Sequence, residues 1–146
     1  MEFRSMIKGR RRARNLALQA LYQWLMSDAD TYAIEMQFSV ANDMTKVDIE
    51  YFQLLLYGVV QHVTAIEAAL LPWLDRPLIS LNPIELTTLR IGAFELLYCP
   101  EIPYRIVLDT SVLLAKEFGS QDGYRYVNGV LNNLAKQFRL IEQSSG

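Results

Sequence analysis

Cysteine and histidine are almost missing from this 146-residue sequence, which contains one of each, Cys99 and His62. A single cysteine excludes an internal disulfide, and one cysteine with one histidine cannot supply the usual ligands of a zinc site. We therefore expect a reducing, cytoplasmic location and neither a metal nor another cofactor. Cys99 precedes a proline and His62 lies in an apolar helical stretch, so we interpret both as structural residues.

Long hydrophobic runs are also missing, although hydrophobic residues make up 51% of the chain. The longest run, residues 54–60, is interrupted by Gly58 and is too short to span a membrane. The basic N-terminus is not followed by a continuous apolar segment, so we expect no secretory signal. Phosphate-cradling glycine loops, nucleophile elbows and paired carboxylates are absent too. The sequence therefore predicts a globular protein that is not an enzyme.

Charge is distributed very unevenly along the chain, although the net charge is only −2. Residues 1–14 contain six basic side chains and one acid, a net charge of +5, whereas residues 15–146 contain eight basic and fifteen acidic side chains, a net charge of −7. A basic segment on an acidic body indicates two different binding faces. The basic segment suits a polyanion such as nucleic acid, but a solvated tail is an equally good interpretation of charge alone.

The hydrophobic pattern has a helical period throughout, and no strand-like alternation competes with it. We expect helices over about residues 9–27, 31–40, 48–71, 83–98 and 103–118, and a last helix that starts near Ser120 and continues at least to Leu134. The predicted fold class is all-α, with about six or seven helices in two packed antiparallel helical bundles. Because Pro72 and Pro77 interrupt the pattern, the N-terminal subdomain is expected to span residues 1–75 and the C-terminal subdomain residues 76–146.

Several residues mark the expected helix ends. Asn82-Pro83 followed by Glu85 resembles a capping box with proline in the first turn. Asp48 is the expected N-cap of the third helix, and Ser120 that of the last. Gly119 is expected to end the preceding helix in a left-handed conformation.

The arginine cluster near the N-terminus is the strongest functional feature, with Arg10, Arg11, Arg12 and Arg14 in five consecutive positions. In the first turn of a helix that starts near Gly9, these cations would oppose the helix dipole. Stability alone would not select that arrangement. Arginines spread around a helix can reach a phosphate backbone and stack on exposed bases.

A second candidate surface lies in residues 119–126, which combine small residues, aromatics and a positive charge. Tyr124 shares its helical phase with Val127 and Leu131, so we assign it to the core. Tyr126 is rotated away from that stripe and is the better candidate for a ring that stacks on a base, although packing is an equally good interpretation.

The chain resembles the NusB family. The resemblance rests on the motifs RRRAR and LQALY near the N-terminus, LRIGAFEL and IPY in the second half, and LAKEFG followed by YVNGVL. These motifs are collinear, and the resemblance covers about residues 8–138.

The resemblance implies an all-α fold and a transcription antitermination factor. It implies binding to single-stranded boxA RNA together with the small-subunit ribosomal protein NusE, within an RNA polymerase antitermination complex that acts on ribosomal RNA operons. The family's RNA contacts match Arg10, Arg11, Arg12, Arg14, Asp122 and Tyr126, and Glu85 matches a partner contact. No membrane association is implied, and whether the free chain forms a homodimer is left open.

The sequence departs from the family pattern on one helix face. Asp109-Thr110 stands where the family usually has Asn-Glu, and Leu113 stands where the family usually has an acidic residue. These departures concern a partner contact and leave the RNA-facing match intact. Two alternatives remain open. One is a protein-only helical adaptor or dimerisation module, whose arginines bind an acidic partner. The other is a domain that assists an RNA-modifying enzyme, which would need a second chain because no cofactor-binding domain is present.

Overall fold

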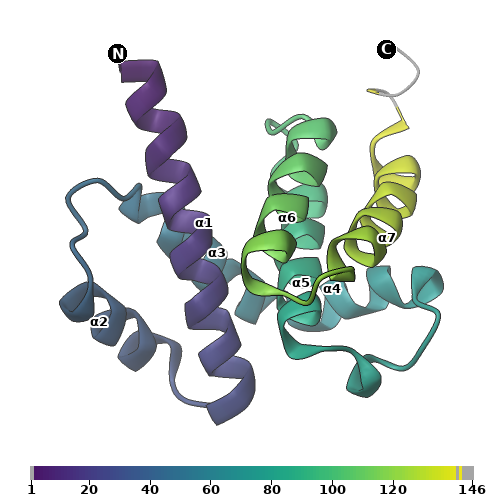
Figure 1. Cartoon of the computed structure of the whole chain (residues 1–146), viewed down its shortest axis with the longest axis horizontal. Helices are drawn as coiled ribbons and strands as arrows, with labels where there is room; N and C mark the ends of the chain where they lie inside the picture. Colours follow the sequence, from purple (N-terminus) through teal and green to yellow (C-terminus); the bar gives the residue numbers. More distant parts are fainter. Residues whose placement is uncertain (1, 141, 143–146) are drawn as a thin grey trace. The chain divides into compact units, whose positions relative to one another are not determined.

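The structure is a computed structural model that describes residues 2–140 and 142. Within these residues it contains seven α-helices and two short 3₁₀-helices and no strand, which confirms the all-α prediction (Figure 1). The chain divides into two compact units, residues 1–61 and residues 62–146. Across the described residues no single helix is long and apolar enough to cross a membrane, and only the segments Ile49–Gln61 and Val63–Trp73, taken together across the break between them, reach that length and composition.

The first unit consists of α1 (Glu2–Ser27), α2 (Thr31–Ala41) and α3 (Ile49–Gln61), and each helix packs on the other two. The apolar residues of α1 that recur every three or four positions are buried, as shown by Ala13, Ala17 and Leu21. In Figure 1, α2 lies beside the C-terminal half of α1, where Gln23 and Gln37 are hydrogen-bonded at 2.9 Å. The connection from α2 to α3 runs back to the N-terminal half of α1, where the Asp48 amide donates to the Gly9 carbonyl at 3.1 Å.

The start of α1 differs from the expectation. The helix begins at Glu2 instead of near Gly9, so the arginine cluster occupies the third and fourth turns and not the first. The argument from the helix dipole therefore does not apply to these arginines, because that effect is confined to the terminal turn.

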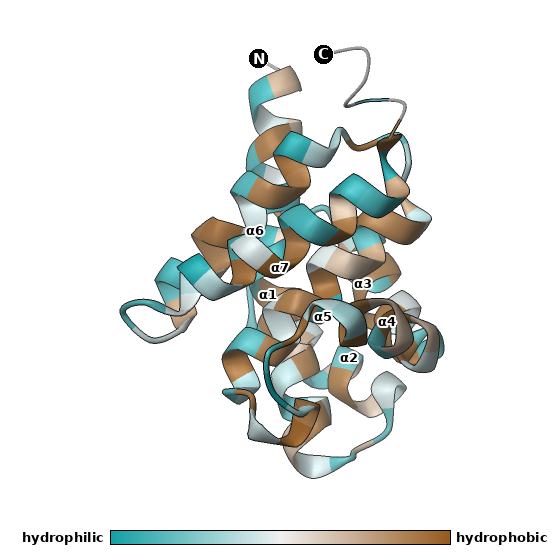
Figure 2. Ribbon diagram, turned by 90° about the vertical axis from the view of Figure 1, so that its right-hand side faces the viewer, coloured by the Kyte–Doolittle hydropathy of each residue, from teal (hydrophilic) through white to brown (hydrophobic). Residues whose placement is uncertain are grey.

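The second unit is built around α5 (Pro83–Tyr98), in which every residue from Glu85 to Leu96 is buried. The helices α4 (Val63–Leu70), α6 (Tyr104–Phe118) and α7 (Gly123–Phe138) all pack on α5, and α6 also packs on α7. The surface helices are amphipathic, and Figure 2 shows hydrophilic and hydrophobic residues alternating along α7. Its predicted stripe is buried at Val127, Leu131 and Leu134.

The helix expected over residues 48–71 is broken at His62, where α3 ends and α4 begins. His62 lies outside helical geometry and stacks on Tyr98 with 4.2 Å between ring centroids. The division between the two units falls at this break, ahead of the position after residue 75 that the prolines suggest. The residues after α4 form two 3₁₀ turns, Leu71–Trp73 and Leu78–Ser80.

The capping predictions are partly confirmed. The Asn82 side chain accepts hydrogen bonds from the amides of Ile84 and Glu85, and Asp48 accepts one from Tyr51. The Ser120 prediction is wrong, because Asp122 stands at the N-cap of α7 and the Ser120 hydroxyl is used elsewhere. Gly119 is extended, with φ −98°, so the left-handed prediction is wrong as well. A Cβ there would lie 2.7 Å from the Ala115 carbonyl oxygen, which explains why glycine fits.

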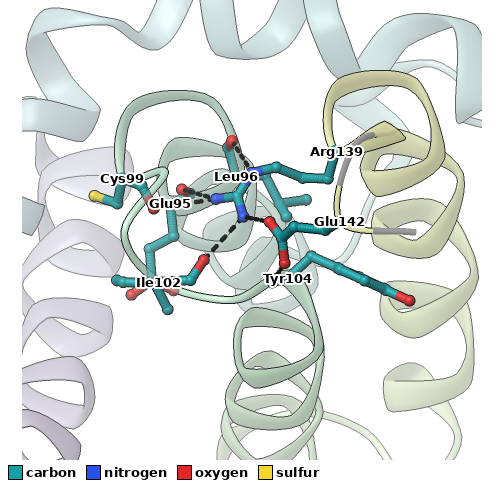
Figure 3. A network of polar contacts seen from close by, with 7 residues as sticks. All are labelled: Glu95, Leu96, Cys99, Ile102, Tyr104, Arg139 and Glu142. Carbon is teal, nitrogen blue, oxygen red and sulfur yellow. Dashed lines mark hydrogen bonds and ion pairs between the residues drawn. The ribbon is translucent and has the colours of Figure 1, made fainter. Parts of the chain in front are cut away.

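The buried Arg139 at the end of α7 joins that helix to the turn between α5 and α6 (Figure 3). Its guanidinium donates hydrogen bonds of 2.9–3.2 Å to the carbonyl oxygens of Glu95, Leu96, Cys99 and Ile102. It also pairs with the Glu142 carboxylate, which accepts a hydrogen bond from the Tyr104 amide. That amide and Arg139 hold the pKa of the Glu142 carboxyl below its ordinary value. This network fixes one end of the helix that carries Tyr126.

Candidate nucleic-acid interface

The four arginines of α1 point in different directions because successive residues of a helix are rotated by about 100°. Arg11 and Arg12 are exposed, Arg10 is half-buried and Arg14 is only 6% exposed. Two of the four are therefore open to a polyanion. The burial of Arg14 leaves little of its surface for the direct RNA contact that the sequence predicts.

Tyr51 on α3 receives the two less exposed arginines. The guanidinium carbon of Arg10 lies 4.4 Å from the centroid of the Tyr51 ring, and that of Arg14 lies 5.2 Å from it. Arg10 also approaches the Asp48 carboxylate at 3.8 Å. A cation over an aromatic face is attracted by the ring's quadrupole. Arg10 and Arg14 therefore hold α1 against α3 and orient the exposed pair.

Two further lysines belong to this surface and were missed by the sequence reasoning. Lys8 and Arg12 lie one turn apart on α1 and line a groove whose opposite wall includes Lys46. The four-residue spacing between Lys8 and Arg12 could have identified Lys8 from the sequence, because residues four apart share a helix face. Lys46 stands alone in the connection between α2 and α3, and no local pattern marks it.

Tyr126 is partly covered in the second unit instead of fully exposed. The Asp75 amide donates to the Tyr126 hydroxyl at 3.4 Å, and the Arg76 guanidinium lies over the ring at 4.7 Å from its centroid. Arg76 is bound in turn to the Asp75 carboxylate at 2.7 and 3.1 Å. Arg76 lowers the pKa of Asp75, and burial raises the pKa of Tyr126. One face of the ring is thus stacked under a cation.

The Glu85 side chain points into the interior of the second unit. It is 7% exposed, and its Oε2 accepts a hydrogen bond from the Ser120 hydroxyl at 3.1 Å. A Cβ at Gly123 would lie 2.5 Å from the same oxygen, so the loop between α6 and α7 closes tightly over Glu85. Glu85 therefore positions this loop and leaves little surface for a partner. The neighbouring Asp122 is exposed at the start of α7.

The core assignment of Tyr124 is wrong, because the residue is only half-buried. Two cations lie near its ring, with Lys116 Nζ at 4.6 Å and the Arg125 guanidinium carbon at 5.7 Å from the centroid. Arg125 Nε donates to the Tyr124 hydroxyl at 3.2 Å and lowers its pKa. Tyr124 also lines a hollow of about 560 Å³ together with Asp109 and Leu113, two of the positions that depart from the family pattern.

The geometry suits binding and offers little equipment for catalysis. Among the described residues no group of three or more His, Cys, Asp or Glu side chains could hold a metal ion. The exposed functional groups are guanidinium and ammonium cations, phenol rings and single carboxylates, which contact phosphates and bases.

Comparison with known proteins places these features in a family. A model described as the NusB family matches residues 11–136. A transcription antitermination protein NusB from Legionella pneumophila (strain Corby) is 68% identical over 138 residues, which is 94% of each chain. Among solved structures, T. maritima NusB is 26% identical with a TM-score of 0.79, covering 92% of this chain and 96% of that one. A structure described as antitermination factors NusB and NusE in complex with dsRNA is 24% identical with a TM-score of 0.78, covers 88% and 97% of the two chains, and supports the fold alone.

Proposed function

The chain belongs to the NusB family, and on that premise we propose that it is a transcription antitermination factor that binds RNA. In this proposal it binds single-stranded boxA RNA jointly with the small-subunit ribosomal protein NusE. The joint complex then joins RNA polymerase and promotes processive transcription of ribosomal RNA operons. Its role is to bind and not to catalyse.

The observation that carries the proposal is the exposed basic face of α1. Arg11 and Arg12 are exposed, and in the described part of the chain neither forms an ion pair with an acidic side chain. Unpaired cations on a rigid helix bind phosphates with little reorganisation, and they release counterions from the nucleic acid. The structure described as antitermination factors NusB and NusE in complex with dsRNA has the same fold as this chain, and the ligands in its description, NusE and an RNA, are of the kinds that we propose here.

Each site residue has a distinct role in this proposal. Arg11 and Arg12 contact phosphates, while Arg10 and Arg14 orient them through Tyr51. On the second unit, Tyr126 stacks on a base through the ring face that Arg76 does not cover. Asp122 accepts hydrogen bonds from base or ribose donors near the start of α7. Glu85 acts through the loop that it anchors.

The test is a binding titration with a boxA-like RNA and a scrambled control, at two salt concentrations, with and without purified NusE. We expect preference for the boxA-like strand, stronger in the presence of NusE, and an affinity that falls steeply with salt. Equal or absent binding of both strands under all conditions would remove the proposal. Binding of an acidic protein partner in place of RNA would then favour the adaptor.

A further inference from the structure

A basic groove lies in the first unit between α1 and the connection that follows α2. We call it the α1 groove; its volume is about 750 Å³. On the α1 side it is lined by Ser5, Met6, Lys8, Gly9 and Arg12, and on the other side by residues 45–48. Ser5, Lys8 and Arg12 are three or four residues apart, so they lie on a single face of the helix. This face differs from the one on which Arg10 and Arg14 contact Tyr51.

Three cations border the α1 groove, namely Lys8, Arg12 and Lys46, and all three are exposed. Lys46 is the only lysine or arginine between Arg14 and Arg76 in the sequence, yet the fold places it opposite the basic face of α1. In the described part of the chain none of the three forms an ion pair. Asp43 interacts electrostatically with Lys46 and Asp48 also lines the groove, but neither forms an ion pair with the three cations. Like charges that gather without ion pairs destabilise a fold modestly, so a ligand that neutralises them would gain affinity.

The acidic residues nearby are engaged in holding the wall of the groove. Asp43 accepts hydrogen bonds from the Thr45 amide at 3.1 Å and from the Thr45 hydroxyl at 2.7 Å, which lower its pKa. Asp48, which also lines the groove, caps α3 through the Tyr51 amide at 3.1 Å and approaches Arg10 at 3.8 Å. The Asp48 amide also binds the Gly9 carbonyl. The wall that carries Lys46 is therefore preorganised against α1.

We propose that the α1 groove binds the phosphodiester backbone of RNA, with Lys46 as a cation that grips the strand from the side opposite Lys8 and Arg12. This inference rests on the proposed function and extends it. The residues that contact RNA then include the connection between α2 and α3. Residues four apart on a helix are separated by a rise of about 6 Å, so Lys8 and Arg12 face different phosphates of one strand. The contact is to the backbone and carries no base preference of its own.

The experiment compares Lys46→Ala with the unaltered chain, using the boxA-like RNA alone and the same RNA extended by several nucleotides at either end. Lys46→Arg keeps the charge, and Lys136→Ala removes an exposed lysine from the second unit as a matched control. We expect one extension to strengthen binding by the unaltered chain. Lys46→Ala should abolish that gain and weaken binding roughly three- to tenfold. It should also lower the salt slope, which is the steepness with which the logarithm of the affinity falls with the logarithm of the salt concentration, by about 0.7.

The controls and the competing ligand make the result decisive. Lys46→Arg should retain the gain from the extension, and Lys136→Ala should bind like the unaltered chain. Unchanged affinity and salt slope in Lys46→Ala would overturn the groove proposal while leaving boxA binding intact. If Lys46→Ala weakens boxA-like and scrambled RNA alike, and the unaltered chain prefers neither, the groove stands and the boxA function fails. Tighter binding of polyglutamate than of RNA, lost in Lys46→Ala, would assign the groove to an acidic protein and overturn the proposal.

Discussion

Arg76 lies over the ring of Tyr126, with its guanidinium carbon 4.7 Å from the ring centroid, while Asp75 holds that guanidinium through two hydrogen bonds. The Asp75 amide also reaches the Tyr126 hydroxyl at 3.4 Å. The connection between α4 and α5 thus fixes the ring orientation from one side. Because these contacts hold the Tyr126 ring in place before RNA binds, a base that stacks on it costs the side chain little conformational entropy.

Replacement of Tyr126 by alanine should weaken RNA binding by about 1–3 kcal/mol, the usual contribution of one base stacked on an aromatic ring. Tyr126→Phe should keep most of the affinity, because it retains the ring and loses only the 3.4 Å hydrogen bond from Asp75. Fluorescence anisotropy with a labelled boxA-like RNA measures both. Tyr124→Ala on the same helix is the matched control, and full affinity in Tyr126→Ala would show that this ring only packs.

The arginines of α1 should separate into two classes when they are replaced singly. Arg12→Ala and Arg11→Ala should lower RNA affinity and the salt slope and leave the unfolding midpoint unchanged, because these side chains are exposed. Arg14→Ala should destabilise the chain by about 1 kcal/mol or more, because its guanidinium is buried against Tyr51. Urea denaturation and RNA titration of each variant provide the comparison. An Arg14→Ala variant with unaltered stability but lost affinity would assign it a direct RNA contact.

Much of the fold could be predicted because most signals in this sequence are local. The Asn82-Pro83 start of α5, the Asp48 cap and the stripe of α1 depend on neighbouring residues and appear as expected. The break at His62 could not be predicted, because the apolar stripe continues from Val59 to Ile66 without a proline or glycine at the break. That break depends on the packing of His62 against Tyr98 on another helix.

The sequence shows which residue types form the candidate site, but it does not show which of these side chains are exposed and which pack against other helices. The arginine cluster is obvious in the sequence, yet Tyr51, which decides that Arg10 and Arg14 turn inward, belongs to α3. Tyr124 has the helical phase of a core residue, but its side chain is only half-buried. The reason is that Tyr124 is the second residue of α7, where the helix begins at the surface. Lys46 carries no local signal, since only the fold brings it to α1.

Two glycines inside helices should respond in opposite ways to alanine. A Cβ at Gly92 would lie 2.5 Å from Leu131 Cδ1 and 2.8 Å from Ser111 Oγ, and both neighbours are buried. Overpacking of about 1–3 kcal/mol should outweigh the gain in helix propensity. Gly129 is exposed and has nothing within 4 Å of its Cβ position, so Gly129→Ala should stabilise the chain by up to about 1 kcal/mol. Thermal unfolding distinguishes the two, and a stabilised Gly92→Ala would contradict the close approach of α5 to α7.

Tyr57 should titrate at high pH and loosen α2 from α3 when it does. Its hydroxyl donates to the Glu35 carboxylate at 2.5 Å, and this bond, with a smaller contribution from burial, raises the pKa of Tyr57 from 10.0 to about 12. Because the folded pKa is raised, the stabilisation is complete below pH 10 and is lost as the pH rises through about 12. Ultraviolet absorbance of tyrosinate should show a tyrosine whose pKa is about 12. Glu35→Gln should bring its pKa back toward 10, and an unchanged titration would refute the assignment.

Arg139 should contribute more to stability than any exposed arginine, because it satisfies four backbone carbonyls in a buried site. Arg139→Ala should cost about 3 kcal/mol or more, since it leaves buried acceptors without donors. Arg139→Lys should cost nearly as much, because one ammonium cannot match the planar fork that reaches both α5 and the following turn. Arg125→Ala, an exposed arginine of the same helix, should change stability by less than about 0.5 kcal/mol.

Urea denaturation gives these differences directly, and RNA titration of the same variants adds a functional consequence. Arg139 fixes the C-terminal end of the helix that presents Tyr126. A loosened α7 should therefore also weaken stacking on that ring, although Arg139 itself has almost no surface for RNA. The loss of affinity should disappear when binding is measured in a stabilising osmolyte that restores the fold. A loss of affinity that persists at full stability would instead give Arg139 a direct part in binding and would contradict its role as a buried clamp.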